Sequence, residues 1–398
     1  MSALEVADIF RDHGAAWRKK HAGHISLDQL KVMSAIERCR TAQLGGHVLC
    51  CTDCGEIQIA YNSCRNRHCP KCQASAAKRW LDARMEDLLP VDYYHLVFTL
   101  PAPIADIAYQ NKAVIYNILF KAAAETLTTI AADPKHLGAL IGMTMVLHTW
   151  GSPLVHHPHV HCIVPGGGFS KDRKQWIACR KGYFLTIAVL SQLFRRLFLE
   201  QLQQAHKGGQ LHFFGQYQGL EDEQKFVDWI KPLRQLNWHL YAKRPFSGPA
   251  AVLEYLSRYT HRVAIGNSRL INVDEQGVTF KYKDYRDKGR YKPKDMTLST
   301  DEFIRRFLLH VLPRGFHRIR HYGFLANARR VENISHAREL LAVPLPQLVD
   351  EAASGDEPPV STYVCRSCEA PMIIIETLAP VGLPRTNLPR APPIIKAA

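Results

Sequence analysis

Four histidines lie within the segment "SPLVHHPHVHCIVPGGG", residues 152–168. Successive side chains of a β-strand point to opposite faces, so His159 and His161 would project from one face, about 6 to 7 Å apart along the chain. Two imidazoles in that position can share one metal ion. Val160 and Cys162 would point the other way, into a core that anchors the strand. The segment therefore predicts a metal-binding histidine pair.

His148 is our candidate for a third ligand of the same metal ion. It lies in "MTMVLHTW", which would pair with "HVHCIV" as an antiparallel hairpin and place His148 opposite residue 159 or 160. A shift of one residue in this pairing would turn the side chain to the wrong face. His156, His157 and the tyrosine-bearing helix described next are the alternatives.

Two tyrosines in "SGPAAVLEYLSRYTHRVAIGNSRL", residues 247–270, are candidate nucleophiles. Pro249 suits the first turn of a helix, and Tyr255 and Tyr259, four positions apart, would then share one helical face. Helical spacing alone favours a pair of core aromatics. The histidine pair and the basic composition favour catalysis instead, because a tyrosine oxygen can attack a phosphodiester that a metal ion polarises.

The cysteines predict a zinc site. Six of the eleven cysteines lie in "CCTDCGEIQIAYNSCRNRHCPKC", and in a reducing compartment such a cluster is more typical of metal binding than of disulfides. We expect the pairs Cys51–Cys54 and Cys69–Cys72 to converge on one tetrahedral zinc ion. Gly55 would provide the positive φ that the first turn needs.

Four further residues are potential zinc ligands. Cys64 and His68 lie in the same segment and are candidates for an exchanged ligand or for a second ion. Cys365 and Cys368 form an isolated "CRSC" near the C-terminus, which is half of a typical site. The sequence leaves the role of this half-site open.

Composition narrows the class of partner. The chain has 398 residues and a formal charge of +15, from 51 Lys and Arg against 36 Asp and Glu. This surplus favours a polyanion, with nucleic acid ahead of a membrane surface. The longest apolar run, within residues 138–148, is too short to span a bilayer, and the N-terminus shows no signal-peptide core. We therefore expect a cytoplasmic protein with no membrane partner; an oligomer is compatible with the sequence.

The order of elements predicts the fold class. Ser26 and Gln29 form a capping box before a helical apolar pattern, and "YYHLVFTLP" is typical of a buried strand. Strands and helices then alternate without a Gly-rich phosphate loop. This predicts an α+β fold with a largely antiparallel central sheet flanked by helices. We expect three parts, namely a helical and zinc-knuckle domain (1–88), a nuclease domain (89–312) and a basic segment with a proline-rich tail (313–398).

Basic and aromatic residues mark candidate DNA contacts. In "GVTFKYKDYRDKGRYKPK", Phe280 and Tyr282 would share one strand face and stack on bases, while lysines on the other face neutralise phosphates. An ordinary exposed hairpin is the alternative. The candidate basic residues are Arg65, Arg67, Lys71, Lys281, Lys283, Arg318 and Arg320.

Six segments carry a resemblance to a known family: "GGHVLCCTDCG", "YNSCRNRHCPKCQ", "HTWG", "HPHVHCIVPGGG", "YLSRYTHRVAI" and "LPRGFHRIRHYGFLANARR". With these six segments in this order, the chain resembles the rolling-circle transposases of the insertion sequence 91 family. These are two-tyrosine members of the HUH (His-hydrophobic-His) endonuclease superfamily with an N-terminal zinc-binding domain. The matching segments extend over most of residues 20–330.

The resemblance implies a metal-dependent nuclease domain that nicks single-stranded DNA at element ends and transfers the strand through a 5′-phosphotyrosine. By position, His159 and His161 match the metal-binding pair, and Tyr255 and Tyr259 match the nucleophiles. The family implies Mg²⁺ or Mn²⁺ at the nuclease site and Zn²⁺ in the N-terminal domain. The family usually has Gln after "HTWG", whereas this chain has Ser152, so no ligand role is assigned there.

Two other classes of function remain open at this stage. A plasmid replication initiator or relaxase of the HUH superfamily would share the histidine and tyrosine chemistry, although no GxxxxGK[ST] helicase signature follows. A non-enzymatic zinc-dependent DNA-binding protein would account for the charge and the cysteines alone.

Overall fold

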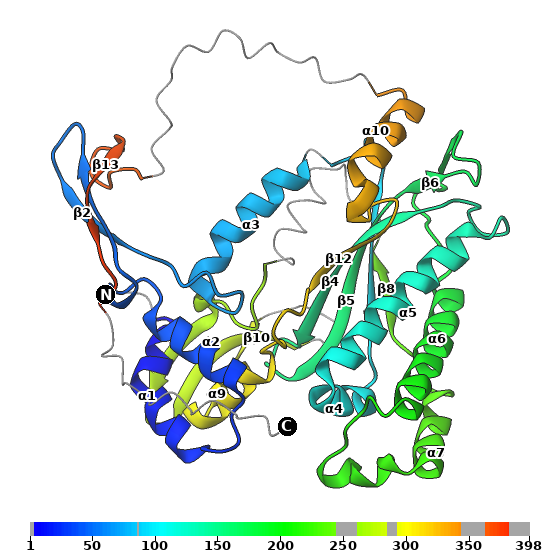
Figure 1. Ribbon diagram of the computed structural model, residues 1–398, viewed down its shortest axis with the longest axis horizontal. Coiled ribbons are helices and arrows are strands. Elements are labelled where there is room, and N and C mark those ends of the chain that lie inside the picture. The colour runs from blue at the N-terminus through cyan, green and yellow to red at the C-terminus, as the bar shows by residue number, and fades with distance from the viewer. Residues whose placement is uncertain (1–3, 86, 244–260, 285–292, 344–362, 382–398) are drawn as a thin grey trace, which may run out of the picture.

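The computed structural model describes residues 4–85, 87–243, 261–284, 293–343 and 363–381 (Figure 1). The predicted α+β class with largely antiparallel sheets is confirmed. Among the described helices, none combines the length and the apolar character needed to cross a bilayer. Tyr255 and Tyr259 lie outside the described residues.

A five-stranded sheet with the order β12-β4-β5-β3-β8 forms the centre of the molecule. Every neighbouring pair in it is antiparallel. Its strands are β3 (Tyr93–Thr99), β4 (Gly142–Trp150), β5 (His156–Pro165), β8 (Leu240–Lys243) and β12 (Ile319–Gly323). The middle strand, β5, is paired along both edges, with β4 on one side and β3 on the other.

Four helices pack on one face of this sheet, and Figure 1 shows α5 and α6 together on that side. They are α4 (Ala102–Gln110), α5 (Lys112–Ala132), α6 (Ile187–Lys207) and α7 (Glu223–Leu233). Val160 and Cys162 belong to the core between the helices and the sheet, as the alternation along β5 predicts. His159 and His161 therefore point to the opposite face.

A second core joins the N-terminal helices to a segment distant in sequence. In it α1 (Val6–Lys20) and α2 (Leu27–Arg38) pack with α9 (Thr300–Leu309) and the three-stranded sheet β11-β10-β9. These strands are β9 (Leu270–Asp274), β10 (Gly277–Lys283) and β11 (Pro293–Leu298). Phe10 and Phe307 make an edge-to-face contact with centroids 5.2 Å apart. Packing therefore crosses the predicted boundary at residue 88, because described residues within 264–284 and 293–311 share a core with the first two helices.

The predicted separate segment 313–398 also needs correction. β12 is an edge strand of the central sheet, where it pairs with β4, and β13 (Met372–Leu378) pairs with β1 (Gly46–Cys51) in the small sheet β13-β1-β2. The C-terminal strand thus belongs to the N-terminal module. The remaining elements are β2 (Ile57–Tyr61), α3 (Pro70–Met85), the hairpin β6 (Gly167–Phe169) and β7 (Trp176–Ala178), and α10 (Arg330–Leu340).

The structure contradicts the prediction that Phe280 stacks on a DNA base. It is fully buried and packs edge to face against Phe303 with centroids 5.9 Å apart, so it cannot stack on a base. Its neighbour Tyr282 is only partly buried.

We expect Phe280→Ala to destabilise this unit by about 3 to 5 kcal/mol, because a buried ring is replaced by a cavity. Tyr282→Ala, the matched control, should cost clearly less. Hydrogen exchange of α9 and β10 amides during chemical denaturation measures the difference locally. Equal losses in the two variants would contradict the assignment of Phe280 to the core.

Candidate metal and DNA-binding site

Three histidines meet on the face of the central sheet that is opposite α5 and α6. β4 pairs with β5 in a register that sets His148 directly opposite His159, and residues opposite each other in a ladder share a face. His161 follows on the same face. Ligand nitrogens of the three lie within 4.8 Å of one another, so the register expected from the sequence is confirmed and the three imidazoles are close enough to bind one ion.

Hydrogen bonds fix the orientation of two of these rings. His161 Nδ1 lies 2.8 Å from Nε2 of His95 on β3, and His159 Nδ1 lies 2.6 Å from the His157 carbonyl oxygen and donates to it. A metal ion would then be bound by the other ring nitrogen, Nε2, of each histidine. Partners of this kind hold metal-binding imidazoles in one orientation.

Trp150 supports the third ring. It stacks on His148 with centroids 4.7 Å apart and an interplanar angle of 19°. The contact restricts rotation of the imidazole.

The environment keeps His159 and His161 neutral, which is the form that binds a metal. Burial lowers the pKa of His159 to about 4 and also lowers the pKa of His161 well below its usual value. After burial, nearby histidines add to the lowering, and the positive charge of Arg262 contributes at both rings.

Arg262 lies two residues after the undescribed segment 244–260. It is three positions beyond Tyr259, its charge acts on both histidines, and its carbonyl accepts a 3.3 Å hydrogen bond from Arg318. The described chain next to the two tyrosines therefore passes close to the histidine trio.

The cysteines form two groups rather than one. In the first, sulfur atoms of Cys39, Cys64, Cys69 and Cys72 lie within 4.8 Å of one another. Cys72 Sγ is 3.6 Å from both Cys39 Sγ and Cys64 Sγ, and Cys69 and Cys72 stand at the start of α3. The group is packed into the second core.

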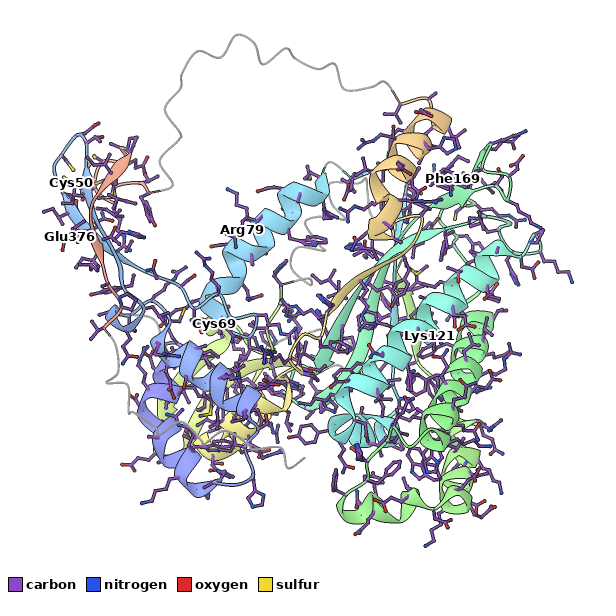
Figure 2. The ribbon with its side chains drawn as sticks, in the orientation of Figure 1. Cys50, Cys69, Arg79, Lys121, Phe169 and Glu376 are labelled. Carbon is purple, nitrogen blue, oxygen red and sulfur yellow. The ribbon has the colours of Figure 1, made fainter. Side chains whose placement is uncertain are left out.

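The expectation that Cys51 and Cys54 share an ion with Cys69 and Cys72 is wrong. Cys51 and Cys54 group instead with the C-terminal Cys365 and Cys368. The two cysteine groups lie apart in the molecule. In Figure 2, Cys50, next to Cys51, lies on the small sheet, whereas Cys69 lies near the N-terminal helices. His68 is in neither group; its ring accepts from the Leu312 amide at 3.4 Å.

The seven basic candidates for DNA contact differ in how they are placed. Arg65, Lys281 and Lys283 are exposed. Lys71 is paired with Glu5, and Arg320 lies over the Phe120 ring and donates to Asn117.

Arg67 and Arg318 are engaged inside the protein. Arg67 donates to the carbonyls of Leu312, Pro313 and Phe316. Arg318 is 9 % exposed and donates to Gln73 Oε1 at 2.9 Å. The prediction that these two arginines grip DNA is not supported by their position, because their guanidinium groups hold segments of the chain together.

Sequence reasoning missed four residues that shape the site. Cys39 lies outside the cysteine-rich segment, and only the count of cysteines near the N-terminus hinted at it. His95 and Arg262 act on the histidines from another strand or across a long stretch of sequence, which carries no local pattern. Trp150 lies two positions beyond His148 on β4, so strand alternation could have identified it.

Comparisons with known proteins agree on one family. Residues 142–332 match the family described as "Putative transposase", and residues 9–100 match "Transposase zinc-binding domain". A relative with the first of these descriptions, y4qJ of Sinorhizobium fredii (strain NBRC 101917 / NGR234), is 58% identical over 345 residues, 87% of this chain and 86% of its own. The transposase for insertion sequence element IS801 of Pseudomonas savastanoi pv. phaseolicola is 26% identical over 369 residues, 90% of this chain and 86% of its own.

Solved structures of the conjugative relaxase TrwC are also similar. The metal-free complex with oriT DNA is 15% identical, with a TM-score of 0.23 and coverage of 42% of this chain and 71% of that chain. The complex with a 27-mer DNA comprising the recognition hairpin and the cleavage site has the same identity and TM-score, with coverage of 62% and 73%. A likeness of this size supports no conclusion about the present chain.

His148→Ala should weaken binding of Mn²⁺ by about 100-fold or more, since loss of an outer partner alone typically costs 10- to 100-fold. His157→Ala, which removes an exposed neighbouring ring, is the matched control and should bind as the wild type does. Isothermal titration gives both affinities. Unchanged Mn²⁺ affinity in His148→Ala would remove this residue from the ligand set.

Proposed function

The chain belongs to the insertion sequence 91 family of transposases, and from that membership we propose that it nicks single-stranded DNA at element ends and transfers the strand by a rolling-circle mechanism. The observation that carries the proposal is the histidine trio, His148, His159 and His161, on one face of a rigid sheet. Its partners are single-stranded DNA and the ends of the element, and the reaction needs no nucleotide cofactor.

The three imidazoles fit a divalent ion. A set of three nitrogen donors without a carboxylate is typical of transition metals, whereas Mg²⁺ prefers oxygen ligands. Of the two ions that the family implies, Mn²⁺ therefore suits the trio better. When bound, the ion polarises the scissile phosphodiester.

The protein's own residues prepare the site. His95 and the His157 carbonyl hold two rings through their Nδ1 atoms, and Trp150 restrains the third. Because burial keeps His159 and His161 neutral, no proton has to leave them before a metal binds at neutral pH.

Tyr255 and Tyr259 are the proposed nucleophiles. The phenol oxygen loses its proton and bonds to phosphorus, the bond from phosphorus to the 3′ oxygen breaks, and that oxygen gains a proton. The products are a free 3′-hydroxyl and a 5′-phosphotyrosyl link that keeps the phosphoester for strand transfer. Support for this assignment comes from Arg262, which is three residues beyond Tyr259 and whose charge acts on His159 and His161.

DNA is held mainly by charge. Lys281 and Lys283 are exposed on β10, and the Lys283 amide donates to Ser152 Oγ at 2.7 Å, which fixes this lysine beside the turn that connects β4 with β5. Arg65 adds a third exposed charge, and the overall charge is +15. Affinity should therefore fall steeply with salt.

Zinc is proposed for the first cysteine group. Cys39, Cys64, Cys69 and Cys72 all lie within the matched zinc-binding domain, residues 9–100. Four thiolates form a closed tetrahedral site of the structural type. An ion there would tie α3 to the N-terminal helices.

His159→Ala should reduce cleavage of a single-stranded element end by about 100-fold or more, because polarisation of the phosphate is worth several kcal/mol and 1.4 kcal/mol is a factor of ten. Binding of the same DNA should be largely kept, since it comes from many basic contacts. Gel-based cleavage and fluorescence anisotropy, with His157→Ala as the control, measure the two effects. Cleavage at the wild-type rate would refute the metal role, and this outcome would favour a non-enzymatic DNA-binding protein.

The tyrosines are tested by replacing only the attacking oxygen. Tyr255→Phe and Tyr259→Phe keep the ring, so a loss of activity reports chemistry rather than packing. The double variant should form no covalent protein–DNA adduct, each single variant should keep some cleavage, and at least one should fail in complete strand transfer. Tyr183→Phe, at an exposed position before α6, is the control.

An adduct in the double variant would discard the tyrosine mechanism. If Tyr255→Phe behaves as wild type while Tyr259→Phe is inactive, the enzyme works with one tyrosine and Tyr255 is a packing residue.

A further inference from the structure

The second cysteine group joins the two ends of the chain. Cys51 is the last residue of β1 and Cys54 follows it, while Cys365 and Cys368 precede β13. Sulfur–sulfur distances are 3.4 Å for Cys51–Cys368, 3.7 Å for Cys54–Cys365 and 3.5 Å for Cys54–Cys368. The domain match at residues 9–100 contains only half of this group.

The two Cys-x-x-Cys turns have the same backbone conformation although their sequences differ. In the first, the Gly55 amide donates to the Cys51 carbonyl at 3.3 Å, and the Cys51 amide donates to the Glu56 carbonyl at 2.9 Å. In the second, the Glu369 amide donates to the Cys365 carbonyl at 3.1 Å.

The match extends to the remaining bond and to the backbone angles. The Cys365 amide donates to the Ala370 carbonyl at 2.9 Å, the equivalent of the Cys51 bond. The residue after each second cysteine has a positive φ, 70° at Gly55 and 62° at Glu369. Residues with a side chain adopt this angle less readily than glycine does, so Glu369 takes at some cost the conformation that Gly55 takes freely.

Burial follows the same pattern in both turns. The first cysteine of each is buried, with Cys51 3% and Cys365 1% exposed, and the second of each, Cys54 and Cys368, is exposed. All four thiols are free, and their separations far exceed the disulfide bond length of about 2.05 Å. Four sulfurs around a zinc ion at about 2.3 Å would lie about 3.8 Å apart, which is close to the observed spacing.

The small sheet needs such a link because it buries little. Its core contains five buried residues, two of which are Cys51 and Cys365. On β13 the side chains of Ile373, Ile374 and Ile375 are 54%, 51% and 52% exposed. Apolar burial on this scale does not hold a three-stranded sheet on its own.

We propose that Cys51, Cys54, Cys365 and Cys368 bind a second, structural zinc ion that fixes the C-terminal strand to the N-terminal module. The ion replaces the thiol protons, which are released on binding. Glu56, which accepts from the Ser367 hydroxyl and from the Cys365 thiol at 3.9 Å, keeps the serine contact afterwards. The site does not depend on the proposed nuclease activity.

Metal content of the full chain tests the site. Native mass spectrometry and elemental analysis of the wild type should give two zinc ions per chain, one for each cysteine group. The double variant Cys365→Ser/Cys368→Ser should lose one ion. Cys50→Ser, adjacent to Cys51 but outside both groups, is the matched control and should keep both. Cys64→Ser should lose the other ion.

Hydrogen exchange locates the structural effect. In Cys365→Ser/Cys368→Ser, β13 amides should exchange at least about 10-fold faster while α1 and α2 are unchanged, because only the small sheet loses its link. A single zinc ion in the wild type that persists in this variant would overturn the proposal, as would a Cys54–Cys365 disulfide in unreduced protein.

A variant that fails to fold would not prevent the test. Titration of the metal-free wild type with Co²⁺ should show two equivalents with thiolate charge-transfer bands and tetrahedral spectra. One such equivalent would overturn the proposal.

Discussion

The pairing of β4 with β5 in a single register is the interaction on which the proposed site depends. It sets His148 opposite His159, and a slip of one residue would send His148 to the helix-covered face. The register is fixed by the other side of the same strands, where Leu147 pairs with Val160 within the main core. Packing of apolar side chains on one face therefore positions the imidazoles on the other. The hydrophobic core on one side of the sheet therefore determines the geometry of the histidine site on the other side.

Alternation along the strands made this part of the molecule predictable. His159, His161 and the direction of Val160 and Cys162 followed from a period of two, and the His148 position followed from hairpin pairing. His95 could not be predicted, because it touches His161 through strand pairing that no local pattern reports. Trp150 lies two positions beyond His148 on β4, so the same alternation could have placed it beside that ring. Phe280 was misassigned for a related reason: a strand pattern shows that two aromatics share a face, but not which of them a distant helix covers.

Cysteine spacing predicted the Cys-x-x-Cys turns and not their partners. The conformation of a turn depends on neighbouring residues, whereas the cysteines that approach it come from distant parts of the sequence. Cys51 and Cys54 lie 311 to 317 residues from the cysteines they approach, and Cys69 is completed by Cys39 from the end of α2. The same long-range closure explains why the predicted domain boundaries did not match the packing. The strand β13, Met372–Leu378, pairs with β1, Gly46–Cys51, so two segments far apart in the sequence form one small sheet.

Pulsed electron paramagnetic resonance of Mn²⁺ bound to the full chain, with a single-stranded element end present, tests the central claim most directly. It detects nitrogen and phosphorus nuclei next to the ion. The account predicts ¹⁴N couplings from the imidazoles of His148, His159 and His161 together with a ³¹P coupling from the DNA, since the ion must contact the sheet and the phosphate at once. A ³¹P coupling without imidazole nitrogens, or imidazole nitrogens with no phosphorus coupling, would contradict it.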